Sequence, residues 1–170
     1  LASLAGISIS SQGVNKAALI LETVESRHFL EHLITFEGVL PSLMAAESFD
    51  VAKKKLIYDK NIFEEETGTW LGEQAVPIPT YLEAHRAYLD SLDISLEKGS
   101  GFIKISFNHV SPIFSKEMLN LIIREINSIM RKKDLEESSA ALTYLKSEIS
   151  KTSLVDIRNS INLLIEGQLQ

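Results

Sequence analysis

Two histidines on one predicted helix have the spacing that most resembles a metal site. His28 and His32 are four residues apart and share a helix face with Glu25. Zinc sites use imidazole and carboxylate ligands at such spacings, as in HExxH, but this motif is absent and no third ligand follows at a recognisable distance. We therefore expect no bound metal and interpret the pair as part of a solvent-facing helix surface.

Three other groups of residues could support chemistry, but each has a simpler interpretation. His109 lies near Ser111 without an acid at a recognisable spacing, and Ser111 is better explained as a helix cap. Residues 99–101 (Gly-Ser-Gly) belong to a predicted hairpin and do not open a helix, so they do not form a phosphate loop. The acidic run 64–66 lacks the interleaved ligands of a calcium loop. We expect no catalytic residue, no cofactor and no enzymatic activity.

A basic run and a single tryptophan are weaker candidates for contact with a glycan. Arg131, Lys132 and Lys133 could bind an anionic glycan or a phosphate, although such a run is more often a charged helix face. Trp70, predicted to lie in an exposed loop, could stack on a sugar.

Composition limits the partners, the cysteine chemistry and the membrane segments that this chain can have. The 170 residues carry a net charge of −6, which argues against a nucleic-acid or anionic-lipid surface. Cysteine is absent, which excludes disulfides and thiolate chemistry. No apolar run reaches the roughly 20 residues that span a bilayer. Because the chain starts without methionine and stops inside a helical pattern, we expect it to be part of a longer protein.

The last third of the chain predicts one very long helix. Ser111 is a preferred N-cap and Pro112 suits the first helical position, where its missing N–H has no intrahelical partner. A helix over residues 112–170 would contain 59 residues. At about 1.5 Å per residue it would be roughly 88 Å long and would project beyond a domain of this size.

The apolar residues of this helix form a stripe that narrows along its length. Residues 121–130 carry a wide stripe, which we expect to pack on a sheet of the base. Beyond residue 134 the stripe is a single seam, and we expect this seam to contact a neighbouring protomer or a returning helix. The candidate assembly residues are Leu145, Ile149, Ile157, Ile161 and Leu164.

The first 110 residues predict a small base that combines helices with a mainly antiparallel sheet. Apolar spacing favours helices over residues 16–36 and 40–46, and Thr80 can cap a third helix that ends near residue 91. Residues 55–58 predict a short strand, and residues 92–109 predict a hairpin because apolar and polar residues alternate on both sides of a glycine-rich turn. The expected fold class is α+β, with a base domain at 1–110 and an extended helix at 111–170.

Several segments, in chain order, resemble the chain-length determinant (Wzz-type) polysaccharide co-polymerases. The most extensive likeness is at residues 98–112, which resemble the junction between strand and long helix in that family. Residues 1–6 resemble the segment after the first membrane span, and residues 17–40 resemble the first periplasmic helix. Further similar positions lie on the long helix: Ile126, Asn127, Arg131, Asp134, residues 138–145 and residues 166–168.

The resemblance implies a bacterial inner-membrane protein whose periplasmic domain, with a membrane-proximal α/β base, lies between two transmembrane helices. Members form homo-oligomers that set the modal chain length of lipopolysaccharide O-antigen or a related glycan, which a separate polymerase builds on a lipid carrier. Both membrane spans, the segment returning after the long helix and the proline-rich membrane motif are absent from this sequence. Two alternatives remain: a co-polymerase for exopolysaccharide or capsule export, and a coiled-coil periplasmic adaptor.

Overall fold

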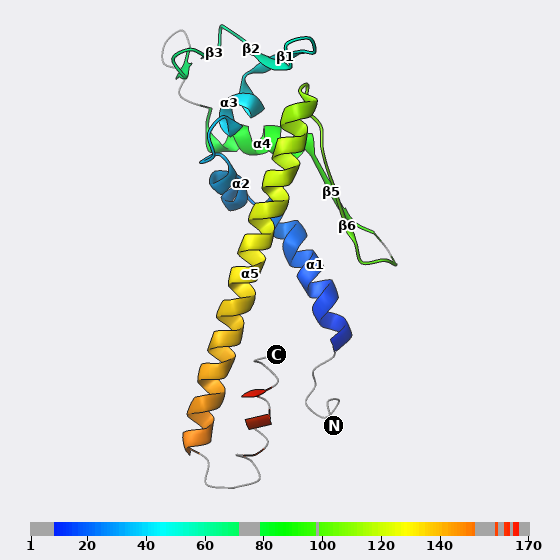
Figure 1. Cartoon of the computed structure of the whole chain (residues 1–170), viewed down its shortest axis with the longest axis vertical. Helices are drawn as coiled ribbons and strands as arrows, with labels where there is room; N and C mark the ends of the chain where they lie inside the picture. Colours follow the sequence, from blue (N-terminus) through cyan, green and yellow to red (C-terminus); the bar gives the residue numbers. More distant parts are fainter. Residues whose placement is uncertain are drawn as a thin grey trace. The chain divides into compact units, whose positions relative to one another are not determined.

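The protein has an α+β fold with small antiparallel sheets and one long helix, as the sequence predicts (Figure 1). The computed structural model describes residues 9–71, 79–97, 99–151, 159, 162, 163, 165 and 166. Its elements in chain order are α1 (Ile9–Glu25), α2 (Arg27–Leu33), α3 (Val39–Met44), β1 (Ala46–Asp50), β2 (Lys55–Tyr58), β3 (Phe63–Glu64), β4 (Thr69–Trp70), α4 (Tyr81–Ser91), β5 (Leu92–Leu96), β6 (Ile103–Phe107) and α5 (Pro112–Lys151).

The chain forms two compact units. Unit 1 is Leu1–Ile126 and unit 2 is Asn127–Gln170. Helix α5 therefore contributes its first turns to unit 1 and the remainder to unit 2.

The predicted helix over residues 16–36 is wrong as a single element, because the chain breaks at Ser26. Ser26 has extended backbone angles, φ −73° and ψ 149°, and its hydroxyl accepts a hydrogen bond from the N–H of Phe29 at 3.1 Å. This bond satisfies one of the free N–H groups at the start of α2. Serine thus begins a second helix within an apolar pattern that continues across the break.

Helix α4 begins and ends where the sequence predicts. The hydroxyl of Thr80 accepts the N–H of Glu83 at 3.3 Å, and the carboxylate of Glu83 accepts the N–H of Thr80 at 2.9 Å. This reciprocal capping box fixes the first turn. The C-cap, Leu92, already has extended backbone angles and begins β5.

Within the described ranges the strands form three separate two-stranded antiparallel sheets, not the single sheet expected from the sequence. Strands β1 and β2 pair, as do β3 and β4, and the predicted hairpin is the pair β5–β6 with Leu92 opposite Phe107. Strands β1, β3 and β4 lie in segments for which the sequence analysis predicted no strand. Trp70 is half-buried in β4 and packs on Phe63 with ring centroids 5.0 Å apart, so the exposed loop predicted for it is wrong.

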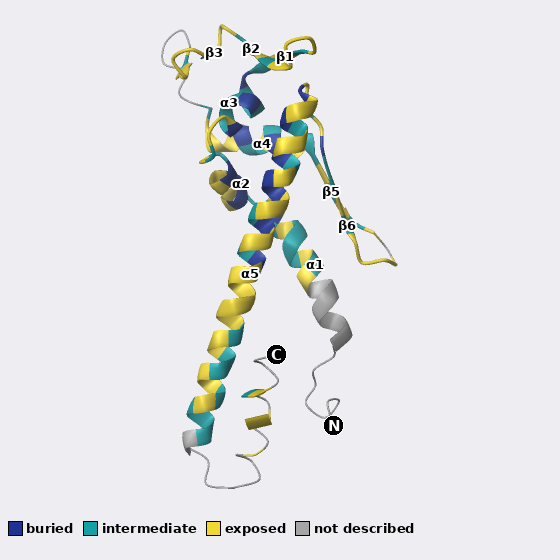
Figure 2. Cartoon of the chain, in the orientation of Figure 1, coloured by how far each residue is buried: buried dark blue, intermediate teal, exposed yellow. Residues whose placement is uncertain are grey.

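The core of unit 1 is mostly helical. Figure 2 shows buried residues on α2, α3 and the first turns of α5. The hydroxyl of Tyr88, a fully buried residue of α4, donates to the carbonyl of Val24 in α1 at 3.0 Å. Burial raises the pKa of Tyr88, so the phenol stays protonated. The buried hydrophobic residues of this unit are Val24, Phe29, Leu30, Leu33, Val39, Ala45, Phe63, Ala84, Tyr88, Phe107, Phe114, Met118, Leu121, Ile122 and Ile126.

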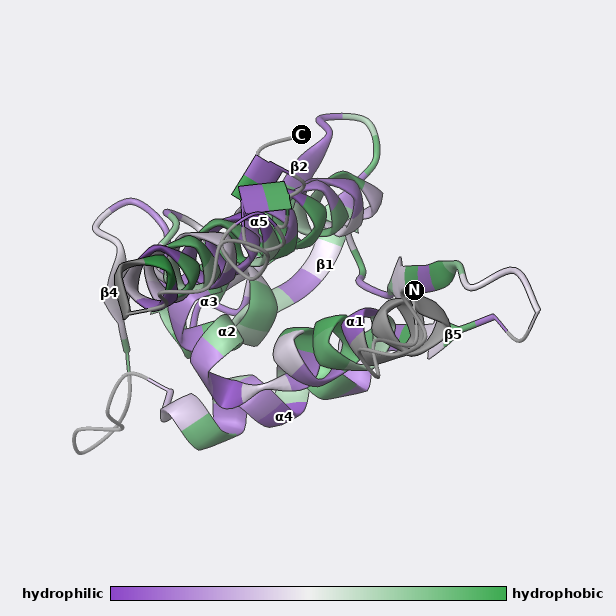
Figure 3. Cartoon of the chain, turned by 90° about the horizontal axis from the view of Figure 1, so that it is seen from below, coloured by the Kyte–Doolittle hydropathy of each residue, from purple (hydrophilic) through white to green (hydrophobic). Residues whose placement is uncertain are grey.

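Helix α5 is described over 40 residues, Pro112–Lys151, and most of the expected continuation to residue 170 lies outside the described residues. Figure 3 shows both hydrophobic and hydrophilic residues along it. Residues 152–158 lie outside the described residues, whereas residues 159, 162, 163, 165 and 166 are helical. Of the helices in the described ranges, none combines the length and apolar character that crossing a membrane requires.

Candidate functional site

The start of α5 is held by a histidine that the sequence analysis did not assign to this role. The Nε2 atom of His109 lies 2.9 Å from the carbonyl oxygen of Ser42, and Nδ1 lies 3.1 Å from the backbone nitrogen of Ser111. A carbonyl can only accept and an N–H can only donate, so the ring must be neutral with its proton on Nε2. Burial lowers the pKa of His109, while the bond to Ser42 acts in the opposite direction. His109 thus joins α3 to the first turn of α5.

Ser111 and Pro112 lie at the helix start, where the sequence places them. Ser111 is 2% exposed, and its hydroxyl accepts the N–H of Phe114 at 3.2 Å, which is the hydrogen bond of an N-cap. Pro112 is the first residue of α5. The ring of Phe114 packs edge-on against His109 with centroids 4.6 Å apart, so the cap is linked to the core of unit 1.

The first turns of α5 contact α2 through a polar cluster. The Nε2 atom of His32 lies 2.8 Å from the carboxylate of Glu125, and the Nε atom of Arg124 lies 2.9 Å from the same carboxylate. The hydrogen bond from His32, followed by that from Arg124, lowers the pKa of Glu125. The guanidinium of Arg124 also lies 5.5 Å from the ring centroid of Phe36. These contacts of Arg124 and Glu125 are made with α2 and with the loop after it.

The histidine pair does not assemble a metal site in the described residues. Residues 28–32 read His-Phe-Leu-Glu-His, which fits the HxxEH pattern of some zinc peptidases and which the sequence analysis did not consider. His28 is exposed, with Nδ1 3.4 Å from Glu31, whereas His32 faces Glu125. No group of three or more His, Cys, Asp or Glu in the described ranges is placed to hold a metal ion.

Part of the predicted assembly seam forms a continuous stripe on α5 within unit 2. Leu145 and Ile149 are half-buried and lie on the helix face that also carries Ser138, Ala141 and Leu142. Leu135, three residues before Ser138 at the edge of this stripe, is 65% exposed, and Tyr144, outside the stripe, is 64% exposed. The remaining seam residues, Ile157, Ile161 and Leu164, lie outside the described residues.

The basic run lies on the surface of α5. Arg131, Lys132 and Lys133 are all exposed. The ammonium of Lys132 lies 4.0 Å from Glu136, and that of Lys133 lies 3.9 Å from Glu137. Such i,i+4 pairs are ordinary for a solvated helix face and offset part of the charge that an anionic glycan would meet.

Unit 1 contains a depression that no sequence motif indicates. It has a volume of about 390 Å³ and lies between the loop after α2, α3 and the first turns of α5. Its walls come from residues far apart in the chain, such as Phe36 and Leu121, which are 85 positions apart, so only the fold brings them together. The residues that carry chemistry at its rim are Glu37, Glu117 and Arg124.

Comparisons with known proteins do not identify the chain. No protein-family model, no curated protein and no solved structure matches it. The junction, the stripe on α5 and the depression are therefore interpreted from the contacts and chemistry of this chain.

Proposed function

We propose that this chain belongs to a non-enzymatic periplasmic scaffold that forms homo-oligomers and regulates the modal length of a bacterial surface polysaccharide. The glycan is O-antigen of lipopolysaccharide, and the partners are its polymerase and the lipid-linked growing chain. The inner-membrane location and the membrane-proximal position of unit 1 belong to the same proposal. Its basis is the resemblance of residues 98–112 and of the long helix to chain-length determinants.

The observation that best supports a scaffold is the apolar stripe on α5 in unit 2. Leu145 and Ile149 lie on a helix with 40 residues, far longer than the three or four turns of a typical globular helix. A large apolar side chain left in water forgoes about 1.5–3 kcal/mol of burial, so a stripe of them favours helix packing. A helix of this kind can hold neighbouring copies in register.

The test combines gene deletion with a two-residue substitution in the full protein. Deletion of the gene is expected to abolish the modal band of the polysaccharide on a gel while polymer is still made. Leu145→Asp with Ile149→Asp is expected to shift or broaden the band, because two charges are placed in the apolar stripe. The proposal fails if the band survives deletion.

A matched variant distinguishes the effect of charge within the stripe from the effect of added charge elsewhere on α5. Asn127 and Ser128 are exposed on the same helix, so Asn127→Asp with Ser128→Asp adds the same charge outside the stripe. This control is expected to leave the polysaccharide pattern unchanged. An equal change in both double variants would show that charge on α5, not the stripe, controls length.

A further inference from the structure

The turn between β1 and β2 presents an exposed cation beside an exposed apolar side chain. Val51 is 78% exposed. The ammonium of Lys53 lies 3.8 Å from Asp50, and that of Lys55 lies 3.0 Å from Glu65. Lys54, between them, has no hydrogen bond or ion pair to any residue that the structure describes.

The backbone at this position is also unusual for a lysine. Lys54 has φ +52°, in the left-handed region that glycine adopts at less cost. It is the one non-glycine residue with positive φ within the described ranges. Residues in such strained backbone conformations cluster at functional sites, and this favours a binding role for the Lys54 side chain.

The depression between α2, α3 and α5 has the complementary chemistry. Its buried apolar floor includes Phe114, Met118 and Leu121. Glu37 and Glu117 at the rim are exposed, and neither side chain has a hydrogen bond or ion pair to a described residue. Arg124, the cation at this rim, is already engaged with the neighbouring Glu125 carboxylate. The site thus offers two carboxylates, without partners among the described residues, above an apolar surface.

We infer that the β1–β2 turn of one copy docks in this depression on the next copy, an inference that rests on the proposed homo-oligomeric scaffold. Lys54 lies between the carboxylates of Glu37 and Glu117, and Val51 covers the apolar floor. Among the possible occupants a second copy is favoured, because this chain itself supplies an exposed feature with the matching charge and apolar character.

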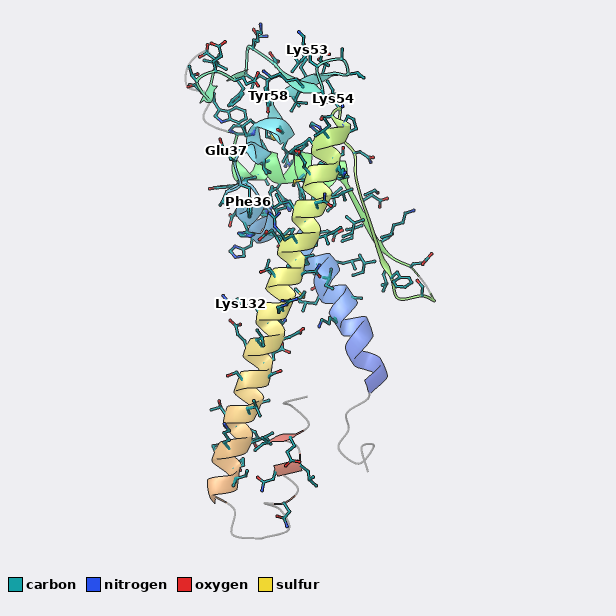
Figure 4. The ribbon with its side chains drawn as sticks, viewed as in Figure 1. Phe36, Glu37, Lys53, Lys54, Tyr58 and Lys132 are labelled. Atoms are coloured by element: carbon teal, nitrogen blue, oxygen red, sulfur yellow. The ribbon has the colours of Figure 1, made fainter. Side chains whose placement is uncertain are left out.

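The two features lie at different places on unit 1. In Figure 4, Lys53 and Lys54 are at the upper end of the unit, whereas Phe36 and Glu37 are at its side. Two different patches therefore meet across the contact, which makes it heterologous. Repeated contacts of this kind build a ring where the rotation closes.

The first experiment introduces one thiol in each patch of the full protein. The chain contains no cysteine, so a short bis-maleimide linker reacts within it only at introduced thiols. In cells expressing Lys54→Cys with Glu117→Cys, the linker is expected to produce a ladder of dimers and higher species. Either single variant is expected to remain monomeric on the gel, because a heterologous contact does not bring identical residues together.

A matched pair controls for random collision. Lys104 is an exposed residue of β6 outside the depression, and its side chain has no described partner, so Lys104→Cys with Glu117→Cys reports how often the two thiols meet by random collision. Equal ladders in the two pairs, or no ladder with the Lys54 pair, overturn the contact. Linkage to a different protein in place of a second copy also overturns it.

The second experiment exchanges the charges. Lys54→Glu is expected to weaken self-association, measured by light scattering of the full protein, by about tenfold or more, because it brings like charges together. Adding Glu37→Lys and Glu117→Lys to the same chain is expected to restore association. Lys104→Glu, with the same change in net charge, is expected to have no effect. Failure of the combined variant to restore association, with its circular dichroism unchanged, contradicts the contact.

These outcomes separate the contact from the proposed function. If the protein assembles and sets polysaccharide length but neither Lys54 experiment has an effect, the contact is wrong and the scaffold function stands. If the ladder forms but gene deletion leaves the polysaccharide unchanged, the contact stands and the function is wrong. A full protein without introduced thiols that is monomeric by light scattering overturns both.

Discussion

Truncation of two neighbouring isoleucines on α5 is the sharpest test of how this helix packs in unit 1. Ile122 is 0% exposed, whereas Ile123, the next residue, is 46% exposed. Ile122→Ala removes buried methyl and methylene groups and leaves a cavity, which costs about 2–5 kcal/mol of unfolding free energy. Ile123→Ala loses less burial free energy because the side chain is half exposed, and the higher helix propensity of alanine offsets about 0.4 kcal/mol of this loss.

The assay is thermal and urea unfolding followed by circular dichroism. For a chain of this length about 1 kcal/mol shifts the melting temperature by roughly 2–4 °C, so a loss of about 3 kcal/mol lowers it by roughly 6–12 °C. Ile123→Ala is expected to shift it by less than about 3 °C on the same scale. Equal losses in the two variants, or a larger loss at Ile123, would refute the helix register described above.

Three further predictions concern single side chains. Tyr88→Phe removes the buried hydroxyl that donates to Val24 at 3.0 Å and is expected to cost about 1–2 kcal/mol in urea unfolding, whereas Tyr81→Phe, at a residue 63% exposed, is expected to have no effect. Burial lowers the pKa of His109, so the unfolded chain binds a proton first as the pH falls. The contribution of His109 to the unfolding free energy is therefore present above about pH 6.5 and is lost as the pH falls through the lower pKa of the folded state. Urea unfolding of His109→Gln at several pH values is expected to lack this part of the pH dependence. Lys54→Gly, which relieves a left-handed backbone at φ +52°, is expected to raise unfolding free energy by about 0.5–1 kcal/mol, and an unchanged or lower value would contradict the strain.

Sequence reasoning located elements whose signals are local. Thr80 with Glu83 three residues later is a capping box, and such a box depends on residues within one turn. The β5–β6 pair was predictable because each strand alternates apolar and polar residues beside a glycine-rich turn. Ser26 shows the limit of this reasoning. It is a good N-cap, but the apolar spacing around it continues, so the pattern predicted one helix where there are two.

The missed strands and the depression depend on contacts between distant residues. Strand β1 reads Ala-Glu-Ser-Phe-Asp, a sequence with weak strand propensity, and it is extended because it pairs with β2. The depression likewise needs α5 to pack beside the loop after α2, which places Glu117 near Glu37. Periodicity along the chain contains no information on such pairings.

The helices of unit 1 form its core, whereas the β1–β2 turn lies at its surface. Substitutions in the two places therefore test stability and assembly separately. A two-stranded sheet is only marginally stable alone, so the three sheets of unit 1 depend on the helical core for their stability. Phe107 and Phe63 place one residue of β6 and one of β3 in that core, whereas Val51 and Lys54 lie at an exposed turn. A substitution at Lys54 therefore changes the surface and leaves the core contacts intact. Truncation at Ile122 does the reverse, so loss of assembly without loss of stability identifies the turn as an interface.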